Sequence, residues 1–375
     1  MGPLEPRSHR HPVALPFSAE AQVTSGPATD DTRAGRADWA KVVARYQGAD
    51  GRRAVVQLLN TLVPLGIVLY VMYLSLDALP YWVTLLIALP AAGLLVRTFI
   101  IMHDCAHGSF FRSKRANTIV GWITGVLTVT PFAQWRHAHA LHHASSGDLA
   151  RRGSGDVDTL TVREYESRSR WGRFKYRVVR NPFILFGIGP LHFMITNRIP
   201  PKGTSLRDKQ GRAVWSTNLA LAVLITAISL LVDWRIIALT YLPAMYIATA
   251  AGIWLFYVQH QFEDTYWRDH ETWDYATAAI RGSSYFRLPK VLDWFTGSIG
   301  FHHVHHLGPR IPNYRLEQAH RDNPMFHDVT TLTIAGSVHT LRLALWDEER
   351  EMLVSFGDAK RRRQKGRVGA LSSAR

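Results

Sequence analysis

Cysteine is almost absent from this sequence of 375 residues, which contains only Cys105. One cysteine excludes an intramolecular disulfide, and the CxxC pairs of iron–sulfur, rubredoxin and zinc motifs are missing. A metal bound by the histidine clusters described below must therefore be held by nitrogen. Cys105 lies two residues from both His103 and His107, so it should point off their shared helix face, and we expect it only to pack.

Acidic side chains are also scarce. The chain has 29 Asp and Glu against 44 Lys and Arg, a formal net charge of +15 and an isoelectric point near 10.2. Such a balance suits nucleic acid, anionic lipid headgroups or an acidic electron-transfer partner. The apolar stretches described next favour lipid and an electron-transfer partner, so we expect no nucleic-acid binding.

Charge is nearly missing from four long stretches, although the mean hydropathy of −0.05 resembles that of a soluble protein. Each stretch can cross a bilayer core of about 30 Å, which makes four buried helices of a soluble protein the weaker interpretation. Polar turns at 77–78 and 233–235 pair the stretches into two membrane hairpins. The predicted spans are residues 54–76, 79–101, 214–232 and 236–258.

The two ends of the chain lack apolar periodicity. We expect residues 1–50 to be a disordered basic tail with a short helix near 39–46, and residues 346–375 to be a basic C-terminal tail. No early apolar segment precedes a small-residue cleavage site, so a cleaved signal peptide is not expected. Residues 51–345 are predicted to form the functional domain.

Two shorter apolar pieces, 118–135 and 182–195, contain Gly and Pro and are marginal as spans. We expect helices that lie at the membrane interface or pack under the site. The N-terminal tail, the segment 112–212 and the run 360–363 are rich in Arg and Lys. The positive-inside rule therefore predicts that both termini and every histidine cluster lie on the cytosolic side.

Eight histidines occur in three clusters of the forms HxxxH, HxxHH and HxxHH. On a helix, spacings of three and four residues place side chains on one face, close enough to share a metal. Eight imidazoles exceed the need of one ion, so two metals with four or five nitrogens each fit better. The clusters are His103 and His107; His139, His142 and His143; and His302, His305 and His306.

The sequence does not distinguish iron from other metals that imidazole binds. A zinc hydrolase of the HExxH type is excluded, since His270-Glu271 lacks the second histidine. Glu317 and His320 form an ExxH pair, but di-iron carboxylate bundles use two such pairs and further Glu residues. We therefore interpret this pair as unrelated to a metal.

Five segments together resemble the membrane fatty acid desaturases, specifically the bacterial acyl-lipid branch that includes omega-6 (Δ12) enzymes. The resemblance runs from about residue 50 to 345, and three boxes in this order between two hairpins are far more specific than one HxxHH. The segments are residues 103–111, 134–143, 155–165, 259–267 and 301–314.

The resemblance implies an all-α integral membrane protein, with four transmembrane helices in two hairpins and a cytosolic helical cap. The cap would hold two iron ions, with the eight histidines of the boxes as ligands and O₂ as co-substrate. The wider desaturase fold implies one more ligand after the fourth span, where this chain has His260.

Other residues near the boxes invite lesser roles. His137 and His303 are off the spacing, and we expect them to orient a ligand or to be structural. The acids that either orient a ligand or form salt bridges are Asp104, Asp156, Asp158, Glu263 and Asp264. The aromatic residues that either line an acyl channel or pack are Trp135, Phe262, Tyr266 and Trp267.

The implied reaction is cis-desaturation of fatty acyl chains in membrane lipids, in the bacterial plasma membrane. No HPGG motif marks a fused cytochrome b5, so a separate ferredoxin is the expected electron donor. Alternatives are a hydroxylase or ketolase of an alkane, sterol or carotenoid, and a histidine-rich metal transporter. The predicted spans contain no histidine, which disfavours transport. The double-bond position stays open.

Overall fold

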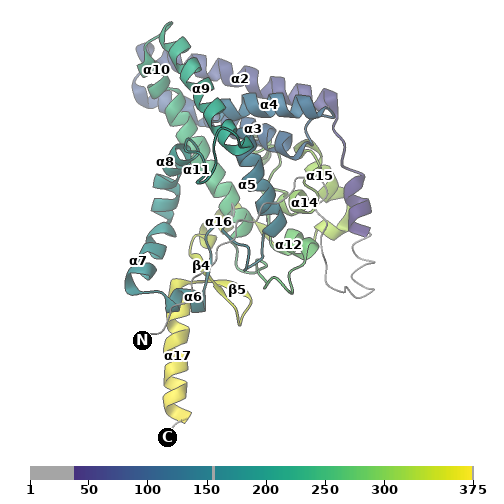
Figure 1. Ribbon diagram of the computed structural model, residues 1–375, viewed down its shortest axis with the longest axis vertical. Helices are drawn as coiled ribbons and strands as arrows, with labels where there is room; N and C mark the ends of the chain where they lie inside the picture. The colour runs from purple at the N-terminus through teal and green to yellow at the C-terminus, as the bar shows by residue number, and fades with distance from the viewer. Residues whose placement is uncertain (1–37, 154–156, 374–375) are drawn as a thin grey trace, which may run out of the picture. The chain divides into compact units, whose positions relative to one another are not determined.

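The computed structural model describes residues 38–153 and 157–373, with side chains up to residue 364. Most of these residues are helical, as predicted (Figure 1). The expected disordered tail lies outside the described residues up to residue 37, and residues 38–44 form the short helix expected near 39–46.

Four helices are long and apolar enough to span a membrane, in agreement with the prediction. They are α2 (Gly51–Ala78), α3 (Tyr81–His107), α9 (Lys209–Ser229) and the pair α10 (Trp234–Leu239) and α11 (Tyr241–His260). The Asp50 side chain caps α2 by accepting from the Arg53 amide. Helices α3 and α11 continue beyond the predicted spans and carry histidines in their last turns.

The first hairpin packs α2 against α3, and α3 also packs against α11 of the second hairpin. The hydroxyl of Tyr81, at the start of α3, donates to the carbonyl of Leu239 at the end of α10. Along the apolar window of α3, 61% of residues are buried, compared with 22–28% for the other three spans. Helix α3 is therefore the central span, and its end delivers the first histidine box.

The stretch 118–135, predicted to be helical and to lie at the interface or under the site, contains parts of two helices, α4 (Lys114–Leu127) and α5 (Phe132–Ser145), bent by 101°. At the bend Val129 has a φ of 52°. A Cβ on Gly125 would lie 2.6 Å from the carbonyl oxygen of Thr130, so glycine permits this tight turn. The bend directs α5, which bears the second box, toward the end of α3.

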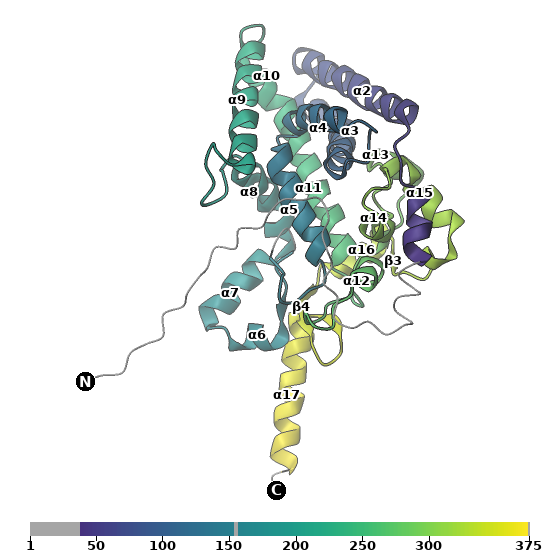
Figure 2. The same ribbon diagram turned by 45° about the vertical axis from the view of Figure 1, so that its right-hand side comes forward.

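The segment between the hairpins also contains α6 (Val162–Ser167), α7 (Arg170–Val179), the π-helical turn η1 (Ile184–Ile188) and α8 (Gly189–Thr196). The piece 182–195, predicted to be helical and to lie at the interface or under the site, thus forms η1 and most of α8. It is bent by 58° relative to α7. Helix α8 packs against α11, and α7 lies below it (Figure 2).

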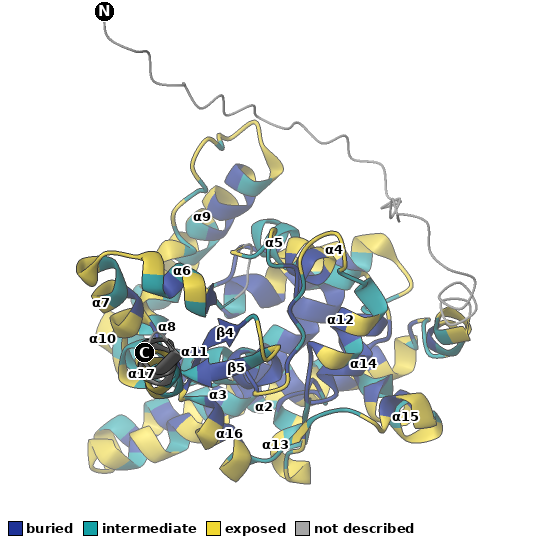
Figure 3. Cartoon of the chain, turned by 90° about the horizontal axis from the view of Figure 1, so that it is seen from below, coloured by how far each residue is buried: buried dark blue, intermediate teal, exposed yellow. Residues whose placement is uncertain are grey.

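Short helices follow the fourth span and hold the third box. They are α12 (Tyr275–Arg281), α13 (Lys290–Phe295), α14 (His302–Leu307), α15 (Asn313–Asp322), the 3₁₀ turn η2 (Pro324–Phe326) and α16 (Ile334–Thr340). Every residue of α14 is buried (Figure 3). The third box is therefore enclosed by protein.

Small sheets interrupt the helical architecture. Strands β1 (Leu160–Thr161), β4 (Leu343–Asp347) and β5 (Met352–Ser355) form one sheet, with β1 parallel to β4 and β5 antiparallel to it. Strands β2 (Tyr285–Phe286) and β3 (Thr331–Leu332) pair in parallel. The predicted start of the C-terminal tail falls inside β4, because buried residues there complete a sheet; α17 (Phe356–Ser373) follows β5.

Candidate metal centre

Four helices bring the nine predicted histidines together. The first box ends α3, the second lies on α5, His260 ends α11, and the third forms α14. These helices come from both hairpins, from the segment between them and from the region after them. No local segment could assemble the centre, because each helix supplies between one and three of the nine histidines.

The nine imidazoles form two groups, within each of which one nitrogen per residue lies within 4.8 Å of the others. Histidine group 1 consists of His103, His107, His139, His143 and His305. Histidine group 2 consists of His142, His260, His302 and His306. The second and third boxes each contribute to both groups, so the two sites share their scaffold.

The spacing of Nε2 atoms suits a shared metal. In group 1, Nε2 of His143 lies 3.1 Å from that of His139 and 3.0 Å from that of His305. In group 2, Nε2 of His260 lies 3.2 Å from that of His142 and 3.0 Å from that of His302. Ligand nitrogens about 2.1 Å from one ion lie about 3.0–3.4 Å apart, so these separations match ligation.

Unpaired buried nitrogens supply a second test of fit. The Nε2 atoms of His107 and His306 are buried and have no hydrogen-bond partner. A buried imidazole nitrogen without a partner loses its hydrogen bonds to water and gains none in the protein, so folded proteins rarely contain such atoms. A metal ion would satisfy both atoms, and an all-nitrogen donor set suits iron, zinc, copper or nickel.

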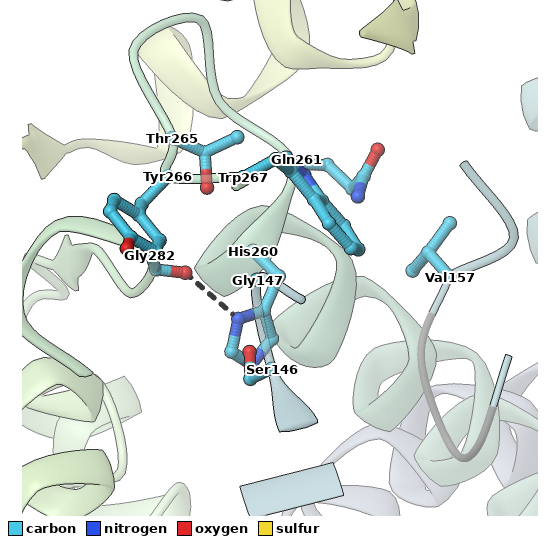
Figure 4. Close-up of a pocket in the computed structure, with 9 residues that line it drawn as sticks. All are labelled: Ser146, Gly147, Val157, His260, Gln261, Thr265, Tyr266, Trp267 and Gly282. Atoms are coloured by element: carbon cyan, nitrogen blue, oxygen red, sulfur yellow. Dashed lines mark hydrogen bonds between the residues drawn. The ribbon is translucent and has the colours of Figure 1, made fainter. Parts of the chain in front are cut away.

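Two of the histidines are oriented through Nδ1. The His103 Nδ1 lies 3.1 Å from Oδ1 of Asp104. The Nδ1 of His260 donates to the carbonyl oxygen of Gly282 at 3.0 Å (Figure 4). An N–H donated from Nδ1 leaves the lone pair on Nε2 for a metal, as is usual for metal-bound histidine.

Of the acids considered for that orienting role, Asp104 alone among the described ones contacts a histidine of either group. The side chain of Asp264 accepts from Thr330. Asp158 and Glu263 accept through their backbone carbonyls, from Tyr176 and from Leu353 respectively. The fifth acid, Asp156, lies outside the described residues.

The two histidines that are off the box spacing lie outside both groups. His303 is fully buried, and its Nε2 lies 3.1 Å from Nδ1 of His320. Burial lowers the pKa of His303 to about 3, so this imidazole is neutral. His320 thus pairs with a histidine, while Glu317 of the same ExxH motif is exposed.

Electrostatics favours the ligand form of the clustered imidazoles. Burial, followed by the charges of neighbouring histidines, lowers the pKa of His143, His302, His305 and His306 well below the usual value. A neutral imidazole has a free lone pair, whereas an imidazolium does not. The site is therefore ready to accept cations at neutral pH.

Aromatic rings surround the histidines. Trp135 stacks on His139 with ring centres 4.3 Å apart. Phe256, which sequence reasoning did not single out, lies 5.1 Å from both His142 and His260. Its position one turn before His260 on α11 is the signal that could have identified it. These rings therefore pack against histidines of both groups.

Tyr266 and Trp267, which were expected either to line an acyl channel or to pack, border a cavity of only about 10 Å³ beside His260 (Figure 4). That volume holds about one water molecule, not an acyl chain. Phe262 is 1% exposed, and Trp267 packs with Trp346. In this conformation these three aromatic side chains pack rather than line a channel.

Comparison with known proteins supplies independent findings. The sequence model of the fatty acid desaturase family matches residues 30–330. A fatty acid desaturase of Bacillus subtilis is 47% identical over 317 residues, which cover 84% of this chain and 89% of that protein.

More distant relatives have more specific names. The sn-1 oleoyl-lipid 12-desaturase of Synechocystis is 25% identical over 284 residues, covering 70% of this chain and 74% of that protein. The sn-1 acyl-lipid omega-3 desaturase (ferredoxin) of the same organism is 27% identical over 234 residues, covering 59% and 62%.

Proposed function

The chain belongs to the fatty acid desaturase family, and from that premise we propose that this oxidoreductase is a di-iron acyl-lipid desaturase of the omega-6 (Δ12) type. Its substrate is a fatty acyl chain of a membrane lipid, and its products are a cis double bond and water. The observation that carries the proposal is the convergence of nine histidines in two groups from four helices.

The proposed ligands of one iron are the five histidines of group 1, and those of the other are the four histidines of group 2. When bound, the two irons supply the redox chemistry that activates O₂ toward an unactivated C–H bond. The short Nε2 separations and the unpaired Nε2 atoms of His107 and His306 support these assignments. The family's reaction supports iron over redox-inert zinc.

The chain's own residues would bind the metals, orient the histidine rings and exclude water. Asp104 fixes the ring of His103, and the Gly282 carbonyl fixes that of His260. Trp135 packs against His139, and Phe256 packs against His142. Overall, one CH₂–CH₂ unit, O₂, two electrons and two protons yield one CH=CH unit and two waters. An enclosed site prevents the loss of reducing equivalents to solvent.

The Δ12 position is supported by the name of the Synechocystis 12-desaturase, which is 25% identical to this chain. The double-bond position depends on how far an acyl chain advances before its carbons meet the metals.

The proposed electron donor is a ferredoxin. The four spans would lie in the plasma membrane of a bacterium, with the site facing the cytosol. The name of the Synechocystis omega-3 relative includes ferredoxin. The net charge of +15 suits an acidic partner. The basic segments at both ends and between the hairpins support a cytosolic site and cytosolic termini.

The alternative functions are less well supported. A hydroxylase or ketolase on the same scaffold has no support among these relatives, which are named as desaturases. Transport of metal ions would place ligands near the middle of the spans. Instead, His103, His107 and His260 lie in the last turns of α3 and α11.

The test is expression of the full chain in a host with saturated and monounsaturated lipids, together with a ferredoxin. Mass spectrometry of fatty acids should detect dienes with a new double bond at Δ12. New monoenes or trienes with the double bond at another position would support desaturase activity but would overturn the Δ12 assignment. Hydroxylated products from iron-loaded protein would overturn desaturation itself.

A further inference from the structure

Helix α7 carries a row of apolar side chains that face away from the protein. Trp171, Phe174 and Val178 are 61%, 54% and 36% exposed. Their spacing of three and four residues places them in one stripe along the helix. On another face Tyr176 is 3% exposed and donates to the carbonyl of Ala344 in β4, which anchors α7 to the sheet. The stripe is therefore held outward.

The stripe is a preformed aromatic surface. The rings of Trp171 and Phe174 stack with centres 5.2 Å apart, and the ammonium of Lys175 lies 5.3 Å from the Trp171 ring centre. Tryptophan with a neighbouring cation is typical of membrane–water interfaces, where one part of the surface is apolar and the other is wet.

The charge around the stripe is of one sign. Residues 168–180 contain six Arg and Lys and no Asp or Glu. Arg170 and Lys175 are exposed and lie at the two edges of the stripe. Cations that flank an apolar row complement anionic lipid headgroups over acyl chains.

The exposed apolar surface continues beyond α7. Phe183 is 87% exposed, and Ile188, Leu191 and Ile195 along η1 and α8 are 55%, 48% and 61% exposed. Helix α8 packs against α11, which belongs to a candidate span. Exposed residues of α7 are yellow in Figure 3, and the exposed side chains of η1 and α8 follow them along the chain.

We propose that α7 is an interfacial helix: its stripe of Trp171, Phe174 and Val178 inserts among lipids, and Arg170 and Lys175 bind the phosphates of anionic headgroups. An acidic soluble protein is the other occupant that such cations attract. The further exposed apolar side chains on η1 and α8 favour the bilayer, because a soluble partner bound to α7 would leave Phe183 and the α8 side chains uncovered. The proposal requires membrane insertion but is independent of the reaction catalysed.

Site-directed spin labelling tests this proposal in full-length protein in nanodiscs of phosphatidylcholine with or without phosphatidylglycerol. The native Cys105 is 2% exposed, so a single new cysteine takes the label. The test variants are Trp171→Cys and Phe174→Cys. Leu219→Cys, 66% exposed on span α9, is the lipid control, and Gln318→Cys, exposed on α15, is the water control.

Labels at 171 and 174 should resemble the label at 219, with collisions favouring O₂ over a water-soluble nickel complex. Adding phosphatidylglycerol should increase the depth of both labels in the bilayer. The double substitution Arg170→Gln and Lys175→Gln should abolish this dependence on anionic lipid. Water accessibility equal to that at 318 would overturn the proposal. So would labels that lose water contact only when a reduced ferredoxin is added, since that result assigns the surface to a protein partner.

Discussion

Asn313 donates two hydrogen bonds to one oxygen of Asp104. Its backbone N–H and its Nδ2 lie 2.7 and 2.9 Å from Oδ2, while the other oxygen of Asp104 faces His103. Oδ1 of Asn313 accepts from Gln57 of α2 at 3.0 Å. This buried chain links the first span to a proposed metal ligand, and sequence reasoning missed both Asn313 and Gln57.

Asn313→Ala should weaken metal binding without removing a ligand. It deletes one donor to Asp104 and leaves Gln57 unpaired, which costs about 1–3 kcal/mol of stability. Loosened orientation of His103 should lower metal affinity about 10–100-fold. Metal titration of the apoprotein measures this effect. The matched control is Asn323→Ala, which also removes side-chain hydrogen bonds near α15. This variant should keep the metal affinity of the unmodified protein.

His142→Ala should lower the iron content from about two atoms per chain to about one or fewer, and should abolish activity, because group 2 has only four nitrogens. His137→Ala on the same helix should keep both irons. Elemental analysis of purified proteins decides between the two. Equal iron loss in both variants would show that the grouping is wrong.

His320→Ala should retain both irons, since His320 contacts His303 rather than either histidine group. It should lower stability by about 1–2 kcal/mol, because the buried Nε2 of His303 loses its partner. Thermal unfolding and iron analysis of the same preparation test the two parts. Loss of one iron would make the Glu317-x-x-His320 motif a ligand pair after all.

Removing metal should destabilise the protein around the histidine groups. Metal at about 100 times its dissociation constant stabilises the native state by about 2.7 kcal/mol for one site. Chelation should therefore lower the unfolding temperature, and Fe²⁺ should restore it. An unfolding temperature unchanged after verified loss of iron would contradict two bound metals, one joining α3, α5 and α14 and the other joining α5, α11 and α14.

Electron delivery should weaken with ionic strength. Exposed cations attract an acidic ferredoxin over roughly 8–10 Å at physiological salt, and added salt screens that attraction. The KM for reduced ferredoxin should rise several-fold with salt, while turnover with a small neutral reductant should not change. Equal salt sensitivity in both assays would point to an effect on the enzyme itself.

Much of this architecture follows from local patterns. Apolar length predicts α2, α3, α9 and the α10–α11 pair, since a bilayer imposes a minimum span. Box spacing identifies eight clustered histidines, and the resemblance to the desaturase fold, rather than a local pattern, adds His260 after the fourth span. Spacing also separates His303 from them, since it occupies another face of α14.

The sequence by itself identified the clustered histidines and the helices long and apolar enough to span a membrane, because the two depend on helical periodicity and on hydrophobic length respectively. Only the tertiary structure decided how the histidines divide, and that Asn313 supports Asp104. It also revealed the outward stripe on α7. Such relationships join residues up to 209 positions apart, and they depend on packing between elements, which no local pattern encodes.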